Sequence, residues 1–297
     1  MQLTNYSLAH GVQNIKSRTA VVVTALTMAV TGGGVAAVTQ FGVAHAAPSS
    51  SSATQSTTTA FTPSVVAGMT TDRTAPSGGY SSTSFGGRDN VLQMNVDGAN
   101  RSTSGSFYYT EGLKQAVNGA VTAKADLYVN SDWIGTSVRA GLWGVGNDAN
   151  GDISAYPIVE FTTAGDGGYT GWRVFNDEVG GWTNLASIPY NTNSWNTVGF
   201  SYNPATTTFD FTINGVAGGS SVATGSVDLS SLIFNNYNYG PTSTNYTVNW
   251  SNLVTGQTVT ADKDSCKNNG YASLSLSDGT TFKNQGSCVS YFASNKH

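Results

Sequence analysis

Apolar and polar residues alternate through the middle of this chain, and Gly-, Asn- and Asp-rich turns interrupt the alternation about every 8 to 12 residues. A period of two is typical of half-buried β-strands, and no long segment keeps the period of an amphipathic helix. Many short strands joined by hairpins pack as two sheets, so we expect an all-β fold, an antiparallel β-sandwich of the jelly-roll type. The predicted strands cover residues 91–96, 120–128, 137–144, 156–162, 171–176, 181–186, 197–203, 208–214 and 246–253.

Charged residues are scarce, and this narrows the function. They make up 10% of the chain, against about 25% in an ordinary globular protein, and the formal net charge is −4. A thin and slightly acidic charge layer argues against a cytosolic helical enzyme and against a basic protein that binds nucleic acid. The hydroxyl-rich and aromatic-rich composition favours a secreted β-protein instead.

The N-terminal segment has the pattern of a targeting signal. Lys16 and Arg18 precede a largely apolar run over 19–46, which ends in a small-x-small cleavage pattern. We expect 1–46 to be a cleaved signal peptide, so that the mature protein is secreted or held at the cell surface with no membrane span; an uncleaved anchor is the alternative. The Ser/Thr-rich residues 47–60 are predicted to be a flexible linker, because they hold too little apolar surface to offset the entropy of ordering.

Four stretches resemble a known superfamily. The text WNTVGFSYNPATTTFDFTING at 195–215 is similar to the laminin-G/concanavalin-A-like sandwiches, in which a Trp opens a strand and the next strand ends in Asn-Gly. The stretches at 71–101, 139–161 and 171–185 resemble secreted bacterial proteins of that superfamily. The resemblance implies a concanavalin-A-like jelly roll over 61–260. This fold carries lectins, adhesion modules, glycosidases and structural domains alike, so it leaves the function open.

Strand alternation gathers polar and aromatic side chains on one face of the predicted sheet. A hairpin through 165–168 sets Glu160 near Arg173, and a second turn brings the next strand alongside. The opposite face, with residues such as Phe161 and Trp172, is the expected sandwich core. The candidate ligand-binding residues on the polar face are Arg139, Trp143, Glu160, Arg173, Trp182 and Asn184, joined by Phe175.

This polar and aromatic face has two interpretations. Aromatic rings stack on sugars and an Arg–Glu–Arg cluster presents directed donors and acceptors, which suits a saccharide groove. The same residues also suit a half-buried ion cluster that stabilises a curved sheet. The leading functional hypothesis is a non-catalytic recognition domain that binds a polysaccharide, a cell-surface glycan or a matrix polymer. A jelly-roll glycoside hydrolase using Glu160 is the first alternative, and a structural envelope protein without a soluble ligand is the second.

Catalysis by a glycosidase needs two carboxylates that face each other across a cleft. The chain holds three Glu and lacks the Glu-x-Asp-x-x-Glu strand motif of laminarinase-like enzymes. The PIVEF text at 157–161 resembles the nucleophile strand of jelly-roll xylanases. In that family the acid/base Glu comes much later on another strand, whereas Glu178 lies in a tight turn and Glu111 precedes Glu160. The sequence therefore favours binding over catalysis and assigns no catalytic residue.

Cofactor signals are few. The three His lie at positions 10, 45 and 297, so the predicted sandwich has no His for a Ser-His-Asp triad or a zinc site. The one candidate metal site is a calcium site at Asp148, Asn150 and Asp152, in a turn that resembles part of an EF-hand loop. Turn chemistry alone also explains an Asx-rich sequence, and the plain turn is the favoured interpretation.

The pattern changes over residues 261–297. The text resembles a C-terminal motif of secreted bacterial proteins, in which Cys-Lys-x-x-Gly-Trp is followed by Phe-Lys-Asn-Gln-Gly-x-Cys-Val; here Tyr271 replaces the Trp, and FKNQG at 282–286 matches. Both cysteines of the chain, Cys266 and Cys288, lie in this cysteine module. In an exported protein we expect them to form a disulfide, with a Cα separation of about 4.4–6.8 Å.

Overall fold

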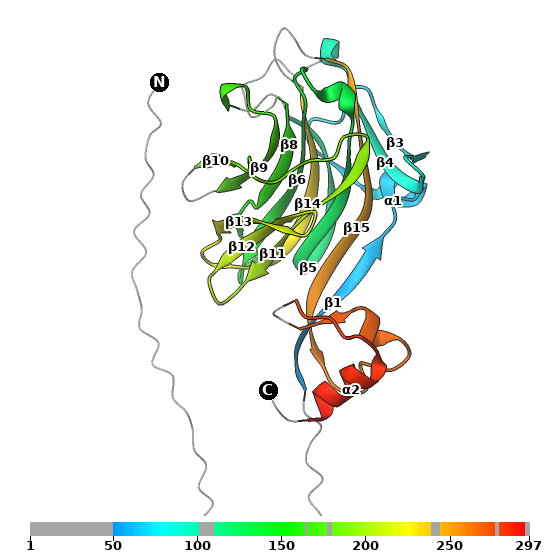
Figure 1. The fold of residues 1–297 in the computed structure, drawn as a ribbon, viewed down its shortest axis with the longest axis vertical. Coiled ribbons are helices and arrows are strands. Elements are labelled where there is room, and N and C mark those ends of the chain that lie inside the picture. The colour runs from blue at the N-terminus through cyan, green and yellow to red at the C-terminus, as the bar shows by residue number, and fades with distance from the viewer. Residues whose placement is uncertain are drawn as a thin grey trace, which may run out of the picture. The chain divides into compact units, whose positions relative to one another are not determined.

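A computed structural model describes residues 50–100, 110–163, 166–176, 180–238, 244–276 and 279–294 (Figure 1). The predicted signal segment 1–46 lies outside the described residues. Within them the strands form antiparallel ladders that build two packed sheets. The predicted all-β antiparallel sandwich is therefore confirmed.

The elements are named in chain order, as in Figure 1. The two α-helices are α1 (Pro63–Gly68) and α2 (Gln285–Ala293). The strands are β1 (Ser51–Thr59), β2 (Thr70–Arg73), β3 (Tyr80–Phe85), β4 (Arg88–Val96), β5 (Thr110–Val129), β6 (Arg139–Asp148), β7 (Ile153–Ala155), β8 (Ile158–Thr162), β9 (Gly171–Asn176), β10 (Gly181–Asn184), β11 (Ser194–Asn203), β12 (Thr208–Ile213), β13 (Val216–Val222), β14 (Ser226–Tyr237), β15 (Tyr246–Ala261) and β16 (Leu274–Ser275).

Two sheets share the long strand β5. Its first half pairs with β14 and β2, and its second half pairs with β11 and β15. One sheet runs β10–β9–β8–β6–β14–β5–β2, and the other runs β13–β12–β11–β5–β15–β4–β3. Asn118 and Gly119 have φ angles of 30° and 86° where β5 changes partners. Asn and Gly adopt this left-handed backbone most readily, so the sequence permits the bend that joins the sheets.

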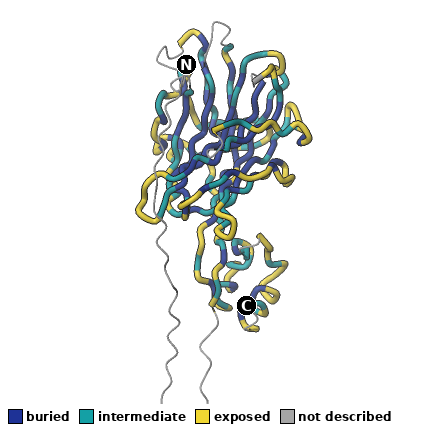
Figure 2. The backbone as a smooth tube through the Cα atoms, turned by 90° about the vertical axis from the view of Figure 1, so that its left-hand side faces the viewer, coloured by how far each residue is buried: buried dark blue, intermediate teal, exposed yellow. Residues whose placement is uncertain are grey.

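The hydrophobic core lies between the two sheets. Trp172 and Phe161 from one sheet are fully buried, with ring centroids 5.1 Å apart, and Phe234 lies 5.3 Å from Trp250 of the other. Figure 2 shows the buried residues following the strands of both sheets, while the C-terminal segment carries mostly exposed and intermediate residues. Burial of these large rings, together with the aliphatic residues around them, stabilises the sandwich.

The Ser/Thr-rich segment corrects one prediction. Residues 51–59, expected to belong to a flexible linker, form β1, which pairs with β15 from Ser51↔Ala261 to Thr59↔Leu253 and also with β16. The composition argument fails because this strand is held by backbone hydrogen bonds to strands already in place, and not by apolar side chains of its own. Ala53 is the exception, since it packs into the small core of the cysteine module.

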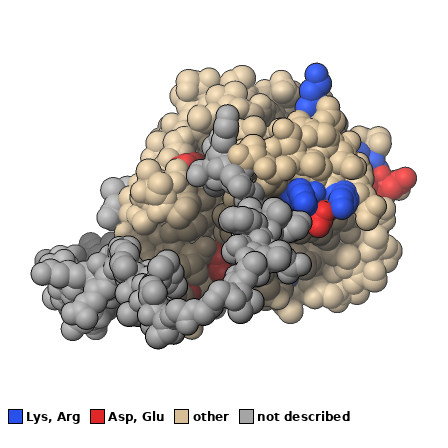
Figure 3. All heavy atoms as spheres, turned by 90° about the horizontal axis from the view of Figure 1, so that it is seen from below, with Lys and Arg blue, Asp and Glu red and all other residues tan. Residues whose placement is uncertain are grey.

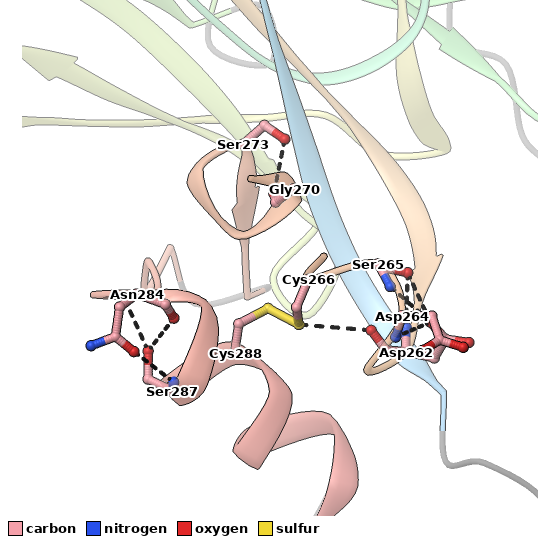
Figure 4. Close-up of a disulfide and its surroundings, with 9 residues drawn as sticks. All are labelled: Asp262, Asp264, Ser265, Cys266, Gly270, Ser273, Asn284, Ser287 and Cys288. Carbon is pink, nitrogen blue, oxygen red and sulfur yellow. Dashed lines mark hydrogen bonds between the residues drawn. A yellow bond between two sulfur atoms is a disulfide. The ribbon is translucent and has the colours of Figure 1, made fainter. Parts of the chain in front are cut away.

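The predicted disulfide between Cys266 and Cys288 is confirmed, with a Cα separation of 5.8 Å (Figure 4). Cys288 lies on α2, and the FKNQG text explains where this helix begins. Asn284 is its N-cap: the side chain accepts a hydrogen bond from the backbone N–H of Ser287 at 2.8 Å, and a capping box completes the turn. Neither this helix nor any other among the described residues has the length and apolarity needed to cross a membrane.

Candidate functional site

Strands β6, β8, β9 and β10 carry the face that alternation predicts to be polar. Glu160 of β8 lies opposite Arg173 of β9, while the neighbouring pair Phe161 and Trp172 points into the core. The observed registers agree with the predicted hairpins, because the short connections leave little room for a slip. We call this surface the pocket face. Its side chains include Arg139, Trp143, Glu160, Arg173, Phe175, Trp182 and Asn184.

A small cavity opens on the pocket face. Its volume is about 120 Å³, below the roughly 300–1,000 Å³ of typical ligand pockets, so it has room for one small group and not for an oligosaccharide. Asn184 lies opposite Arg173 at the sheet edge, exposed and outside the cavity. The lining residues are Thr110, Arg139, Trp143, Glu160, Trp182, Asn235 and Tyr237.

Glu160 and Arg173 form a buried ion pair at the bottom of the site. Their side chains are 4% and 1% exposed. Nε of Arg173 donates to Oε1 of Glu160 at 2.7 Å, and Nη2 lies 2.5 Å from the same oxygen as an ion-pair contact. The Arg173 Cζ lies 3.9 Å from the centre of the Trp182 ring. Charge-assisted hydrogen bonds of this kind hold a carboxylate in its ionised form and in one orientation. Glu160 is therefore a fixed anion at the cavity wall.

Arg139 supplies a second cation to the cavity. Its Cζ lies 4.1 Å from the centre of the Tyr237 ring, on the neighbouring strand β14. The buried Tyr246 fixes both strands from behind: its hydroxyl accepts from the N–H of Tyr237 at 3.0 Å and lies within hydrogen-bond distance of the carbonyls of Tyr237 and Arg139. Burial raises the pKa of Tyr246 well above the ordinary value of 10, so this phenol keeps its proton.

Two hydrogen-bond donors of the lining have no partner within the described part of the chain. These are Nδ2 of Asn235 and Nε1 of Trp143, on side chains that are 4% and 9% exposed. Buried donors are almost always satisfied in native proteins, and an unsatisfied one costs about 1–3 kcal/mol. Both atoms are shielded from solvent in this structure, so neither faces the open cavity directly.

Three of the lining residues were not predicted from the sequence: Thr110, Asn235 and Tyr237. They come from β5 and β14, which lie between β6 and β2 in the sheet. A hairpin argument cannot reach them, because β14 follows β6 by more than seventy residues, as their numbers show. An unusual signal was available, since the Asn235-Asn236 pair sits inside an otherwise apolar run.

The remaining carboxylates near this sheet face elsewhere or are ion-paired. Glu111 is 1% exposed and accepts hydrogen bonds from Ser77 and Asn238 on the core side of β5. Asp72 lies on the pocket face beside β5, with its carboxylate 2.7 Å from Nη2 of Arg73. Glu178, the third Glu considered in the sequence, falls outside the described residues. Among the described residues that line the cavity, Glu160 is the one carboxylate.

The turn proposed for calcium is organised by its own hydrogen bonds. Oδ1 of Asp148 accepts from the backbone N–H of Asn150 at 2.8 Å and of Asp152 at 2.9 Å. These bonds, that of Asp152 foremost, lower the pKa of Asp148. No group of three or more His, Cys, Asp or Glu in the described ranges is placed to hold a metal ion. A calcium site that also uses Asn150 stays a prediction.

Comparisons with known proteins agree on the fold. No protein-family model and no curated protein sequence matches the chain. Solved structures do: a glycosidic hydrolase at 12% identity (68% of this chain, 95% of that chain, TM-score 0.42) and the β-glucanase of Bacillus licheniformis at 13% identity (70% and 98%, TM-score 0.38). The chain spans only 16% of the length of a sialidase to which it is also similar, at 11% identity over 60% of this chain with a TM-score of 0.37. Identities this low show the fold alone.

These comparisons correct the leading functional hypothesis. We expected a non-catalytic recognition domain, yet the similar structures are described as a glycosidic hydrolase, a glucanase and a sialidase. These descriptions correspond to the glycoside hydrolase alternative and not to the binding domain.

Proposed function

We propose that the protein is a glycoside hydrolase that acts on a polysaccharide at the pocket face, with Glu160 as its reacting carboxylate. The observation that carries this proposal is the placement of Glu160: an anion, fixed by Arg173, at the wall of a cavity lined by Trp143 and Trp182. Aromatic walls bind the apolar faces of sugar rings, and a fixed carboxylate is the group that attacks or stabilises an anomeric carbon.

The chemistry follows from the ionised state of Glu160. A carboxylate oxygen bonds to the anomeric carbon as the glycosidic C–O bond breaks, and the departing oxygen takes a proton from a general acid. Water then cleaves the glycosyl ester and regenerates the carboxylate. Arg173 keeps Glu160 ionised and oriented between turnovers, which makes it a positioning residue. No second carboxyl group lies among the described residues that line the cavity, so the departing oxygen takes its proton from another group.

The first test is release of reducing ends from a panel of polysaccharides. We expect cleavage of at least one polymer by the wild type and none above background by Glu160→Gln. Glu111→Gln is the matched control, because it makes the same change at an equally buried carboxylate on the opposite face of the sheet. Thermal melting of both variants shows that they are folded. Equal activity of Glu160→Gln and the wild type would refute the role of Glu160.

Chemical rescue separates a nucleophile from a structural anion. With Glu160→Ala and an activated glycoside, azide enters the space left by the carboxylate and attacks the anomeric carbon. We expect a glycosyl azide product by mass spectrometry, and none with Glu111→Ala. A folded Glu160→Ala protein that azide cannot rescue, in a protein that does cleave glycosides, would assign the reaction to another carboxylate.

We further propose that the protein works outside the cell. The basic and apolar pattern of 1–46 supports this, as does the Cys266–Cys288 disulfide, which persists in oxidising compartments. N-terminal sequencing of protein recovered from culture medium should begin near Ala47. Recovery of the intact chain from the cell interior alone would overturn the assignment.

A further inference from the structure

Cations gather on the pocket face of a protein that has few of them. The whole chain holds 13 Lys and Arg against 17 Asp and Glu, and the surface seen in Figure 3 is mostly neutral. Yet among the described residues four guanidinium or ammonium groups lie on the pocket face, beside the carboxylates of Asp72 and Glu160, which pair with three of the four. The four cations are Arg73, Lys114, Arg139 and Arg173.

Arg73 reaches this face through an unusual backbone conformation. Its φ angle is 54°, in the left-handed region that seven Asn residues but few other non-glycine residues in the described part of the chain adopt. Its Nε donates to Thr110 Oγ1 at 2.9 Å, and its Cζ lies 4.8 Å from the centre of the Trp143 ring, so the guanidinium joins two residues of the cavity lining. A strained backbone that places a cation at a cavity points to a role in binding.

The cavity itself fits an anionic group. At about 120 Å³ it holds one substituent of a sugar, and Arg139 lies in its wall. Among the described lining residues Glu160 is the one anionic acceptor, and it is already paired with Arg173. The side chains of Thr110, Asn235 and Tyr237 can donate as well as accept. A lining with this surplus of positive charge suits the oxygens of a carboxylate or a sulfate ester.

From this arrangement we infer that the polysaccharide is anionic, and that Arg139 and Arg73 bind a carboxylate or sulfate group of the sugar seated beside Glu160. This inference rests on the proposed function only in treating the polysaccharide as a substrate. The binding itself does not require cleavage. Arginine suits the task because its planar fork binds two oxygens of such a group at once.

The test measures binding with turnover removed. The folded Glu160→Gln protein is run by affinity electrophoresis through matched polymer pairs: polygalacturonate against its methyl ester, and dextran sulfate against dextran. We expect retention by a charged polymer and not by its neutral partner, weakened about tenfold or more by Arg139→Gln, since a charged hydrogen bond is lost. Arg88→Gln is the matched control. Arg88 lies on β4 of the other sheet and also stacks on an aromatic ring, 4.4 Å from the centre of Trp195.

Each outcome decides between the two proposals. Equal retention by charged and neutral polymers, or retention by neither, overturns the anionic substrate, whether or not the wild type cleaves a neutral glycan. Retention that Arg88→Gln weakens as much as Arg139→Gln also overturns it, because the attraction is then a non-specific effect of charge and not binding at the pocket face. Specific retention by one charged polymer that the wild type never cleaves supports the anion site and refutes the hydrolase. The pair that shows retention separates carboxylate from sulfate recognition.

Discussion

The two faces of the β6–β8–β9 region come from alternate residues of the same strands, yet they are stabilised in different ways. On the core side, rings such as Phe161 and Trp172 pack at 5.1 Å with no exposure. On the pocket face, one buried ion pair stacked on Trp182 lies beside a small apolar cluster that includes Trp143 and Ile233. Replacing a buried ion pair by apolar residues often costs nothing, so the pair is poorly explained by stability and better explained by a site.

The largest expected effect contrasts one tryptophan from each face. Trp172→Ala should lower the free energy of unfolding by about 4 kcal/mol, because it removes a fully buried ring from the core. Trp182→Ala, at a half-buried position, should cost about 1 kcal/mol while reducing polysaccharide retention strongly. Urea unfolding of both variants measures the difference. Similar losses would mean that the pocket face is a second packed core.

The ion pair allows a sharper test by a double-mutant cycle. Arg173→Met should cost about 3 kcal/mol, because it leaves the carboxylate of Glu160 buried without its main cation. The double variant Arg173→Met/Glu160→Leu should recover most of that loss, with no recovery of activity. If the double variant stays as unstable as Arg173→Met alone, the pair contributes net stability to the fold and the contrast between the faces fails.

Two glycines of β6, one on each face, allow the faces to be compared by the addition of a single methyl group. A Cβ at Gly144 meets Leu229 and Pro157 at 2.8 Å in the packed interior, so Gly144→Ala should cost about 2 kcal/mol. A Cβ at Gly141 meets Nε1 of Trp143 at 2.8 Å, and that indole can move into the cavity. Gly141→Ala should therefore change retention more than melting temperature. The reverse ranking in a melting experiment would contradict this.

The smallest expected effect concerns Tyr246, which supports the cavity from the core side. Tyr246→Phe should cost about 1 kcal/mol at neutral pH, since the N–H of Tyr237 loses its acceptor. The pKa of Tyr246 is raised in the folded state, so its contribution is complete below its ordinary value of 10 and is lost as the pH rises above that value. The wild type should thus lose more stability than the variant between neutral and alkaline pH, as denaturant titrations at each pH would show. If the wild type and Tyr246→Phe showed the same pH dependence, the Tyr246 phenol would be exposed to solvent and not buried.

The hairpins β8–β9 and β9–β10 could be predicted because short turns and strict alternation fix their registers, which placed Glu160, Arg173 and Trp182 correctly. Strand β14 gave no such signal. It lies in the middle of the sheet between β5 and β6 and is buried on both faces, so its residues do not alternate, and Asn235 escaped notice. Arg73 was equally hidden, because its place depends on a left-handed backbone that no periodicity reports. Local sequence patterns predicted the cavity residues on β6, β8, β9 and β10. Those on β5 and β14 depend on pairing between strands far apart in the sequence.

Strand β1 carries a consequence for the order of folding. Both of its neighbours, β15 and β16, come from the far end of the sequence, and the N–H of Ser56 already bonds to the carbonyl of Ser273. Strand β1 can pair with β15 and β16 only after nearly the whole chain has been synthesised. Until then its backbone N–H and C=O groups lack these partners. An apolar waiting strand would invite aggregation. The run of Ser and Thr in 51–59 lowers the tendency of this unpaired segment to aggregate before β15 and β16 form.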